Sequence, residues 1–241
     1  MARPSTPEEL LHKAMNARSA SERARHARKG LAARSTIDRE THAMLLRQLY
    51  LSHFEARRFE KALDIAEQAL ELDVLPDVMH QDAARAALAA GDLEASLTHL
   101  RLAARRSPAS RRAFHQWTLG SILFMAQRYD DSIAALERAS RWATIEKPLY
   151  RAHLALARIA KGDHVADLQR TIDALAEAPC GQGYGRFVLG HLAYAAGEFR
   201  AARRYLDAFV SRTESGKQAL GIALEGELQM AKATLAKMES N

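Results

Sequence analysis

The chain has 241 residues, 48% of them apolar, so it is long enough to bury a sizeable core. Its 35 Lys and Arg residues outnumber its 29 Asp and Glu residues, and the net charge of +6 is compatible with acidic partners or simply with a well-solvated surface. Cys180 is the single cysteine, which excludes an internal disulfide, and no apolar run approaches the roughly 20 residues of a membrane span, so we expect a cytoplasmic protein without membrane insertion.

Proline and glycine divide the chain, and no stretch shows the alternation typical of strands, so all predicted elements are helices. Thr6 and Ser107 each precede a proline, as at many helix starts, and Thr6 with Glu9 forms a candidate capping box. In chain order, we predict helices at 7–18, 21–34, 38–55, 59–73, 76–89, 93–106, 108–126, 130–143, 146–160, 164–177, 182–195, 199–213 and 217–238.

From residue 38 onward these helices form pairs that recur every 34 to 36 residues. Each repeat has a small or polar turn residue, a bulky residue two positions later, and two packing positions further on. The turn positions are Arg57, Gly91, Gln127, Gly162 and Gly197. The bulky positions are Phe59, Leu93, Tyr129, His164 and Phe199. The packing positions are Ala62, Ser96, Ser132, Asp167 and Ala202, and then Ala69, Ala103, Ala139, Ala174 and Phe209. A repeat of this length is one helical hairpin that must stack on copies of itself.

Small residues are also expected where the two helices of a pair meet, at Gly120 and Gly190. The fourth repeat departs from the pattern, because His164 takes its bulky position and Asp167 a small one.

This set of residues resembles the tetratricopeptide repeat family over residues 37–215, with five repeats at about 43–76, 77–112, 113–147, 148–182 and 183–215. Residues 1–36 would hold N-terminal helices, which could form a degenerate sixth repeat. Residues 216–241 would form a C-terminal capping helix. The resemblance implies an all-α, right-handed superhelical solenoid of antiparallel helix pairs. It also implies that the first helix of each pair lines a concave groove that binds a peptide or helix of a partner protein.

The residues that the resemblance places in this groove are unusually rich in rings, although aromatics make up only 6% of the chain. The groove residues are Arg47, Arg85, Phe114, Trp117, Phe124, Tyr184, Phe187, His191 and Tyr194. For the ambiguous fourth repeat, the best fit is Leu149, Ala152, Leu156 and Ile159. The alternative is that the rings are core, so we expect about half of them to be exposed. Trp117→Ala is expected to weaken binding and to leave stability nearly unchanged.

The last predicted helix carries an apolar stripe of Leu220, Leu224, Leu228, Ala231, Leu235 and Met238. Such a stripe suits a cap on the final hairpin, or alternatively a helix that docks on another copy and makes a homo-oligomer.

Arginine clusters offer a second kind of partner, nucleic acid or an acidic protein. They lie at 18–34, 101–112 and 200–204, without any nucleic-acid-binding motif, so nucleic acid is the less favoured alternative. The Cys180–Gly185 run lacks the strand and the Gly-Lys-Ser/Thr ending of a phosphate loop and is predicted to be a turn.

None of the ten histidines belongs to a metal-binding or catalytic motif. We therefore expect no catalytic residues, no metal and no cofactor, and interpret the chain as a non-catalytic scaffold or adaptor for protein–protein interaction.

Overall fold

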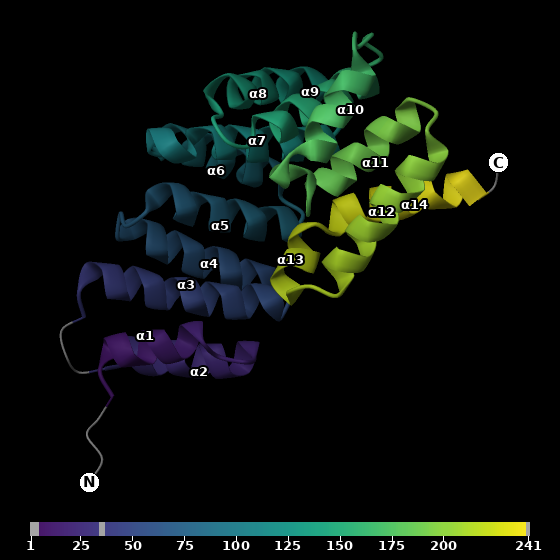
Figure 1. Ribbon diagram of the computed structural model, residues 1–241. Coiled ribbons are helices and arrows are strands. Elements are labelled where there is room, and N and C mark those ends of the chain that lie inside the picture. The colour runs from purple at the N-terminus through teal and green to yellow at the C-terminus, as the bar shows by residue number, and fades with distance from the viewer. Residues whose placement is uncertain (1–4, 34–36, 240–241) are drawn as a thin grey trace. The chain divides into compact units, whose positions relative to one another are not determined.

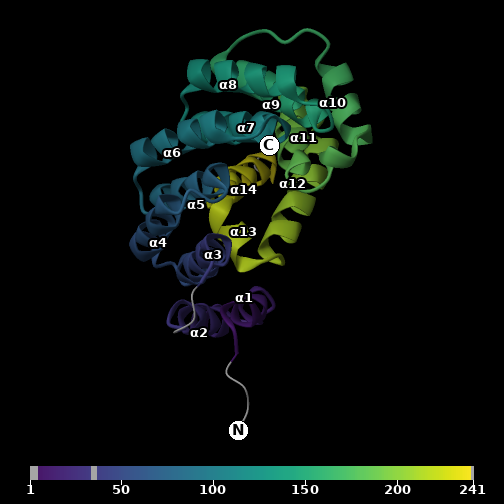
Figure 2. The ribbon, with the colours of Figure 1, turned by 90° about the vertical axis from the view of Figure 1, so that its left-hand side faces the viewer.

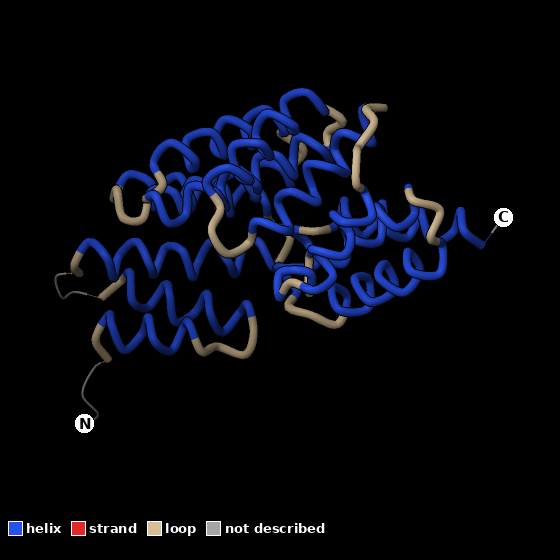
Figure 3. The backbone as a smooth tube through the Cα atoms, turned by 45° about the horizontal axis from the view of Figure 1, so that its top comes forward, coloured by secondary structure: helices blue, strands red, loops and turns tan. Residues whose placement is uncertain are grey.

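The computed structural model describes residues 5–33 and 37–239. Over these residues the backbone consists of helices and loops, without strands (Figure 3). The all-helical prediction is therefore confirmed. The chain divides into two compact units, Met1–Ser107 and Pro108–Asn241, and each unit is described by itself.

The described residues of the first unit form six helices that pack in chain order. They are α1 (Pro7–Met15), α2 (Ala20–Leu31), α3 (Arg39–Glu55), α4 (Phe59–Glu71), α5 (Pro76–Ala89) and α6 (Leu93–Arg106). Each helix packs against the next within the unit, and α1 also contacts α3 (Figure 1). Thr6 and Glu9 form the predicted capping box at the start of α1.

The second unit continues the pattern of neighbouring helices. Its elements are α7 (Ala109–Met125), α8 (Tyr129–Trp142), α9 (Lys147–Lys161), α10 (Leu168–Glu177), a 3-10 turn (Pro179–Gly181), α11 (Gly185–Ala195), α12 (Phe199–Glu214), α13 (Gln218–Ala223) and α14 (Glu225–Glu239). Helix α9 contacts both α10 and α11, α11 packs on α12, and α14 lies against α12 and α11 (Figure 2).

The turn inside each helix pair has the same backbone conformation in all five repeats. The turn residues have positive φ angles, namely Arg57 54°, Gly91 91°, Gln127 59°, Gly162 97° and Gly197 79°. In each case the next backbone N–H donates to the carbonyl five residues earlier, as Asp92 N does to Ala87 O at 2.9 Å. This is the Schellman arrangement, which satisfies a carbonyl at the helix end. The predicted turn positions are therefore confirmed.

Two glycines allow close contact within their helix pairs. A Cβ atom on Gly120 would lie 2.6 Å from Leu136 Cγ, and one on Gly190 would lie 2.5 Å from Leu206 Cγ. The two glycines are separated by the same number of residues as the two leucines, so both contacts occupy the same position of the repeat.

Gly120→Leu is expected to lower the free energy of unfolding by about 1–3 kcal/mol, because the added side chain overpacks the α7–α8 contact. Urea unfolding of the purified protein measures the change. The matched control is Gly221→Ala in α13, where the added Cβ has no atom nearer than 3.7 Å. Equal stabilities for the Gly120 variant and the wild type would contradict this packing.

The fourth repeat is where the sequence-based register is wrong. Helix α10 begins at Leu168 rather than 164, after Asp167 with a φ of 54°. Ala174, predicted to be packed, is exposed, and Ile172 and Leu175 are buried instead. Because α10 begins later in the chain than predicted, its buried residues also come later than the predicted packing positions.

The last predicted helix, 217–238, is also interrupted. Leu224, with a φ of −114° and a ψ of 21°, separates α13 from α14. Two glycines, Gly221 and Gly226, flank this position and lower the helix propensity on both sides of it. Helix α13 therefore ends at Ala223, and α14 begins at Glu225 and packs on α12.

Candidate functional site

The nine predicted groove residues fall in both units and differ in burial. Arg47 on α3 and Arg85 on α5 belong to the first unit, and the seven others belong to the second. Within the second unit the buried members are Phe124, Phe187 and His191, and the half-buried members are Phe114, Trp117, Tyr184 and Tyr194. Their side chains therefore form part of the packing of the second unit as well as part of its surface.

In the first unit, the two arginines contact an internal acid. Arg47 Nε donates to Asp82 Oδ2 at 2.6 Å, and Arg85 Nη1 lies 3.6 Å from Asp82 Oδ1. Asp82 is 1% exposed, whereas Arg85 is exposed. The structure thus gives both arginines a carboxylate partner within the unit, a partner that the sequence analysis did not identify.

Asp82→Asn is expected to lower the free energy of unfolding by about 1–3 kcal/mol, because it leaves the half-buried Arg47 guanidinium without a charged partner. Arg85→Ala, which removes an exposed partner of the same carboxylate, is expected to cost less than about 1 kcal/mol. Denaturant titration of both variants tests the difference. Equal losses would mean that burial of Asp82 does not determine the strength of these contacts.

In the second unit, side-chain rings from the first helices of three successive helix pairs meet. We call Trp117, Tyr150, His153, Tyr184, Phe187 and His191 the ring cluster; they come from α7, α9, α11 and the residue before α11. Trp117 stacks on Tyr150 with ring centroids 5.7 Å apart and meets Tyr184 edge-on at 5.0 Å. Phe187 contacts His191 edge-on at 4.6 Å. The cluster therefore joins three successive helix pairs through side chains of one kind.

Polar contacts inside the ring cluster orient its members. Trp117 Nε1 donates to His153 Nδ1 at 3.2 Å. The hydroxyl of Tyr184 lies 2.7 Å from Ser121 Oγ and 3.2 Å from Glu227 Oε1 of α14. A hydroxyl both donates and accepts, so Tyr184 can bridge the serine and the carboxyl group.

Burial shifts the pKa values of the groups around Tyr184. Burial raises the pKa of Glu227 to about 7, although its backbone and Tyr184 hydrogen bonds act in the opposite direction. Burial also lowers the pKa of His153 to about 3, with a further contribution from His191, and lowers that of His191 to about 4. Near neutral pH both imidazoles are therefore uncharged, while Glu227 is close to its titration midpoint.

The sequence analysis missed three members of this site. In the fourth repeat it chose Leu149 and Ala152 for the groove, whereas Tyr150 and His153, each one residue later, contact Trp117. It also did not identify Glu227, which lies three residues after Leu224 and four before Ala231, and hence on the apolar side of α14. That spacing was the available signal.

The arginine clusters are partly engaged in contacts of their own. Arg106 pairs with Asp73, Arg23 with Glu55, and the Arg112 guanidinium lies 5.8 Å from the centroid of the Trp142 ring. Arg34, at the end of the first cluster, lies outside the described residues.

Among residues 5–33 and 37–239, no group of three or more His, Cys, Asp or Glu side chains could hold a metal ion. Over the same residues, no helix combines the length and the apolar character needed to cross a bilayer. Cys180 and Gly181, at the start of the Cys180–Gly185 run, belong to the 3-10 turn Pro179–Gly181, and Cys180 is a half-buried free thiol.

Comparison with protein-family models yields no match for this chain, and a search of curated proteins yields no significant match.

Proposed function

We propose that this protein is a non-catalytic scaffold or adaptor built from tetratricopeptide-like repeats that stack as a right-handed solenoid. The support for the repeat is local and regular. Five turns with the same Schellman hydrogen bond occur at the predicted repeat positions, and successive helices pack on one another within each unit. Such stacks present long surfaces made of the first helices of the pairs, and these surfaces suit the binding of other proteins.

The observation that carries the proposal is the ring cluster with its flanking rings. Three successive first helices bring their aromatic side chains together, and Phe114, Trp117 and Tyr194 retain partly accessible surface. Aromatic side chains at the centre of an interface supply much of the binding energy, because they bury a large apolar area. The partner is accordingly a protein segment with apolar side chains, bound at the α7–α9–α11 surface.

Site-specific photo-crosslinking tests the position of this surface. A benzoylphenylalanine replacing Phe114, half-buried on α7, is expected to form a defined adduct with a protein partner in native extract. The matched control is the same residue at Trp142, an aromatic position on α8 that is 42% exposed. Adducts of equal yield at both positions, or at Trp142 alone, would contradict binding through the first helices.

Salt dependence separates this function from the nucleic-acid alternative. A complex held by apolar and aromatic contacts is expected to change little between about 50 and 200 mM salt, whereas one that neutralises several phosphates loses orders of magnitude in affinity. Binding that disappears over this range and is not reduced by competing protein would overturn the scaffold proposal in favour of nucleic acid.

A further inference from the structure

Helix α14 lies against two helices of the α7–α9–α11 surface, α7 and α11, in the described structure. It packs on α11 and α12. At its start, Gly226 lies close to Met125 of α7, because a Cβ atom added to Gly226 would be 3.3 Å from the Met125 methyl carbon. Its most buried residues are Glu227, Ala231 and Thr234, which follow one another at helical spacing. A helix therefore already lies against the α7 and α11 part of this surface, and most of its packing is with α12.

The first residue of this buried stripe, Glu227, is unfavourable for a purely structural helix. Glu227 is 4% exposed, and its carboxyl oxygen Oε1 accepts a hydrogen bond from the Tyr184 hydroxyl at 3.2 Å. Burying a carboxyl group costs free energy unless its hydrogen bonds are well satisfied, and an apolar side chain of similar volume would avoid that cost. Glu227 thus lowers the stability of the fold relative to an apolar residue, and it makes a specific polar contact with Tyr184.

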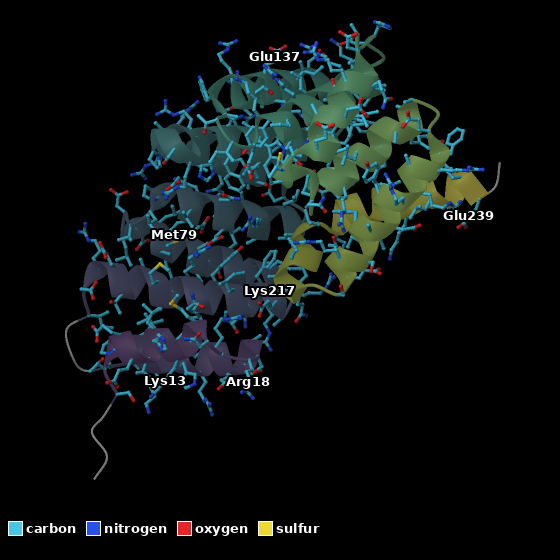
Figure 4. All side chains as sticks on the ribbon, in the orientation of Figure 1. Lys13, Arg18, Met79, Glu137, Lys217 and Glu239 are labelled. Carbon is cyan, nitrogen blue, oxygen red and sulfur yellow. The ribbon has the colours of Figure 1, made fainter. Side chains whose placement is uncertain are left out.

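Two ion pairs that join α14 to α12 are exposed. Lys232 Nζ lies 2.6 Å from Glu214 Oε1, and Arg203 Nη1 lies 3.1 Å from Oε1 of Glu239, near the C-terminal end of α14 (Figure 4). Exposed ion pairs of this kind contribute little to stability. Leu224 interrupts the helix before α14, so α14 can undock as a separate helix, with loss of its own contacts to α11 and α12.

We propose that α14 is an internal occupant of a helix-binding surface, and that the partner is an amphipathic helix that presents a carboxyl side chain to Tyr184 and a small residue four positions later. The partner helix binds where α14 lies and displaces it. This inference rests on the proposed function, since it names the kind of partner that the α7–α9–α11 surface takes. Affinity for the partner is then reduced by the fraction of molecules in which α14 is docked.

A peptide of residues 224–239, labelled with a fluorophore at its N-terminus, is the probe, and the full chain is the receptor. Ala231→Asp in the receptor places a charge at a position that is 0% exposed and weakens docking of its own α14. Ala233→Asp, the same substitution at an exposed position of α14, is the matched control. Fluorescence anisotropy is expected to show binding to the Ala231 variant at least about tenfold tighter than to the wild type or the Ala233 variant.

The carboxyl requirement is tested with a second peptide carrying Glu227→Lys, which is expected to lose binding to the Ala231 variant. A folded Ala231 variant that binds neither peptide, or binds both equally, overturns the proposal. Tighter binding accompanied by a wild-type dimer in light scattering would assign the surface to α14 of a second copy, which also overturns it.

Hydrogen exchange of the wild type provides a measurement that does not depend on the folding of any variant. Amides of 225–239 are expected to exchange through an opening of lower free energy than those of α7 and α11. Exchange of α14 only together with α7 and α11 would make it an integral cap and overturn the inference. The Phe114 crosslink would still report a partner in that case, so the proposed function and this inference can fail separately.

Discussion

A Trp117→Ala variant is expected to lose about 3–5 kcal/mol of its free energy of unfolding, which is the usual cost of deleting a large packed aromatic side chain. The indole stacks on Tyr150, meets Tyr184 edge-on and donates a hydrogen bond to His153. Its removal therefore opens a cavity among rings of three helix pairs and leaves His153 Nδ1 without its donor. Urea unfolding followed by circular dichroism measures the loss.

The matched control is Trp142→Ala on α8. Trp142 is 42% exposed and contacts the Arg112 guanidinium, a surface interaction whose loss costs about 1 kcal/mol or less. A Trp117 variant as stable as the Trp142 variant would restore the sequence-based expectation that Trp117 serves binding alone. The structure leads instead to a mixed role, in which the same ring stabilises the unit and offers part of its surface.

A Glu227→Gln variant is expected to lose the pH dependence of α14 docking and to be more stable than the wild type above pH 7. The folded pKa of Glu227, about 7, exceeds its ordinary value of 4.5. Folding therefore retains a proton that the unfolded chain releases, so this contribution is complete below pH 4.5 and is lost as pH rises to about 7. Between pH 5 and pH 8 the wild type is expected to lose roughly 2–3 kcal/mol relative to the variant.

Comparison of the two proteins at each pH isolates Glu227 from the histidines. His153 and His191 have lowered pKa values, so they remove stability as pH falls below 6.5, and they do so equally in both proteins. Glu239→Gln, at an exposed position of the same helix, is the control and is expected to leave the pH profile unchanged. Parallel profiles for the wild type and the Glu227 variant would show that the carboxyl group is solvated.

Local turn chemistry explains why the helix pairs could be predicted. Gly91, Gly162 and Gly197 adopt left-handed conformations that glycine accepts without strain, and Arg57 and Gln127 occupy the same position of the repeat. A periodic signal of this kind depends only on neighbouring residues. It therefore gave the helix order and most helix ends within a few residues, and it placed Gly120 at a close contact that the structure bears out.

Tertiary packing determined what the sequence pattern could not supply. In α9, Tyr150 and His153 contact Trp117 of α7, one residue later than the positions chosen from the sequence. Burial of Glu227 likewise depends on the hydroxyl of Tyr184, which is distant in sequence. The pattern predicted rings on the first helices of the pairs, but it did not indicate the acid that contacts Tyr184 or the helix that carries this acid.

The order in which contacts form during folding follows from the packing of neighbouring helices. Most helix contacts in the second unit join consecutive elements, so they close short loops and are expected to form early. Ser121 and Tyr184 are 63 residues apart, and Tyr184 and Glu227 are 43 residues apart. Because closing longer loops carries a larger entropy cost, these two hydrogen bonds of Tyr184 are expected to form late in folding, after the neighbouring helix pairs have assembled.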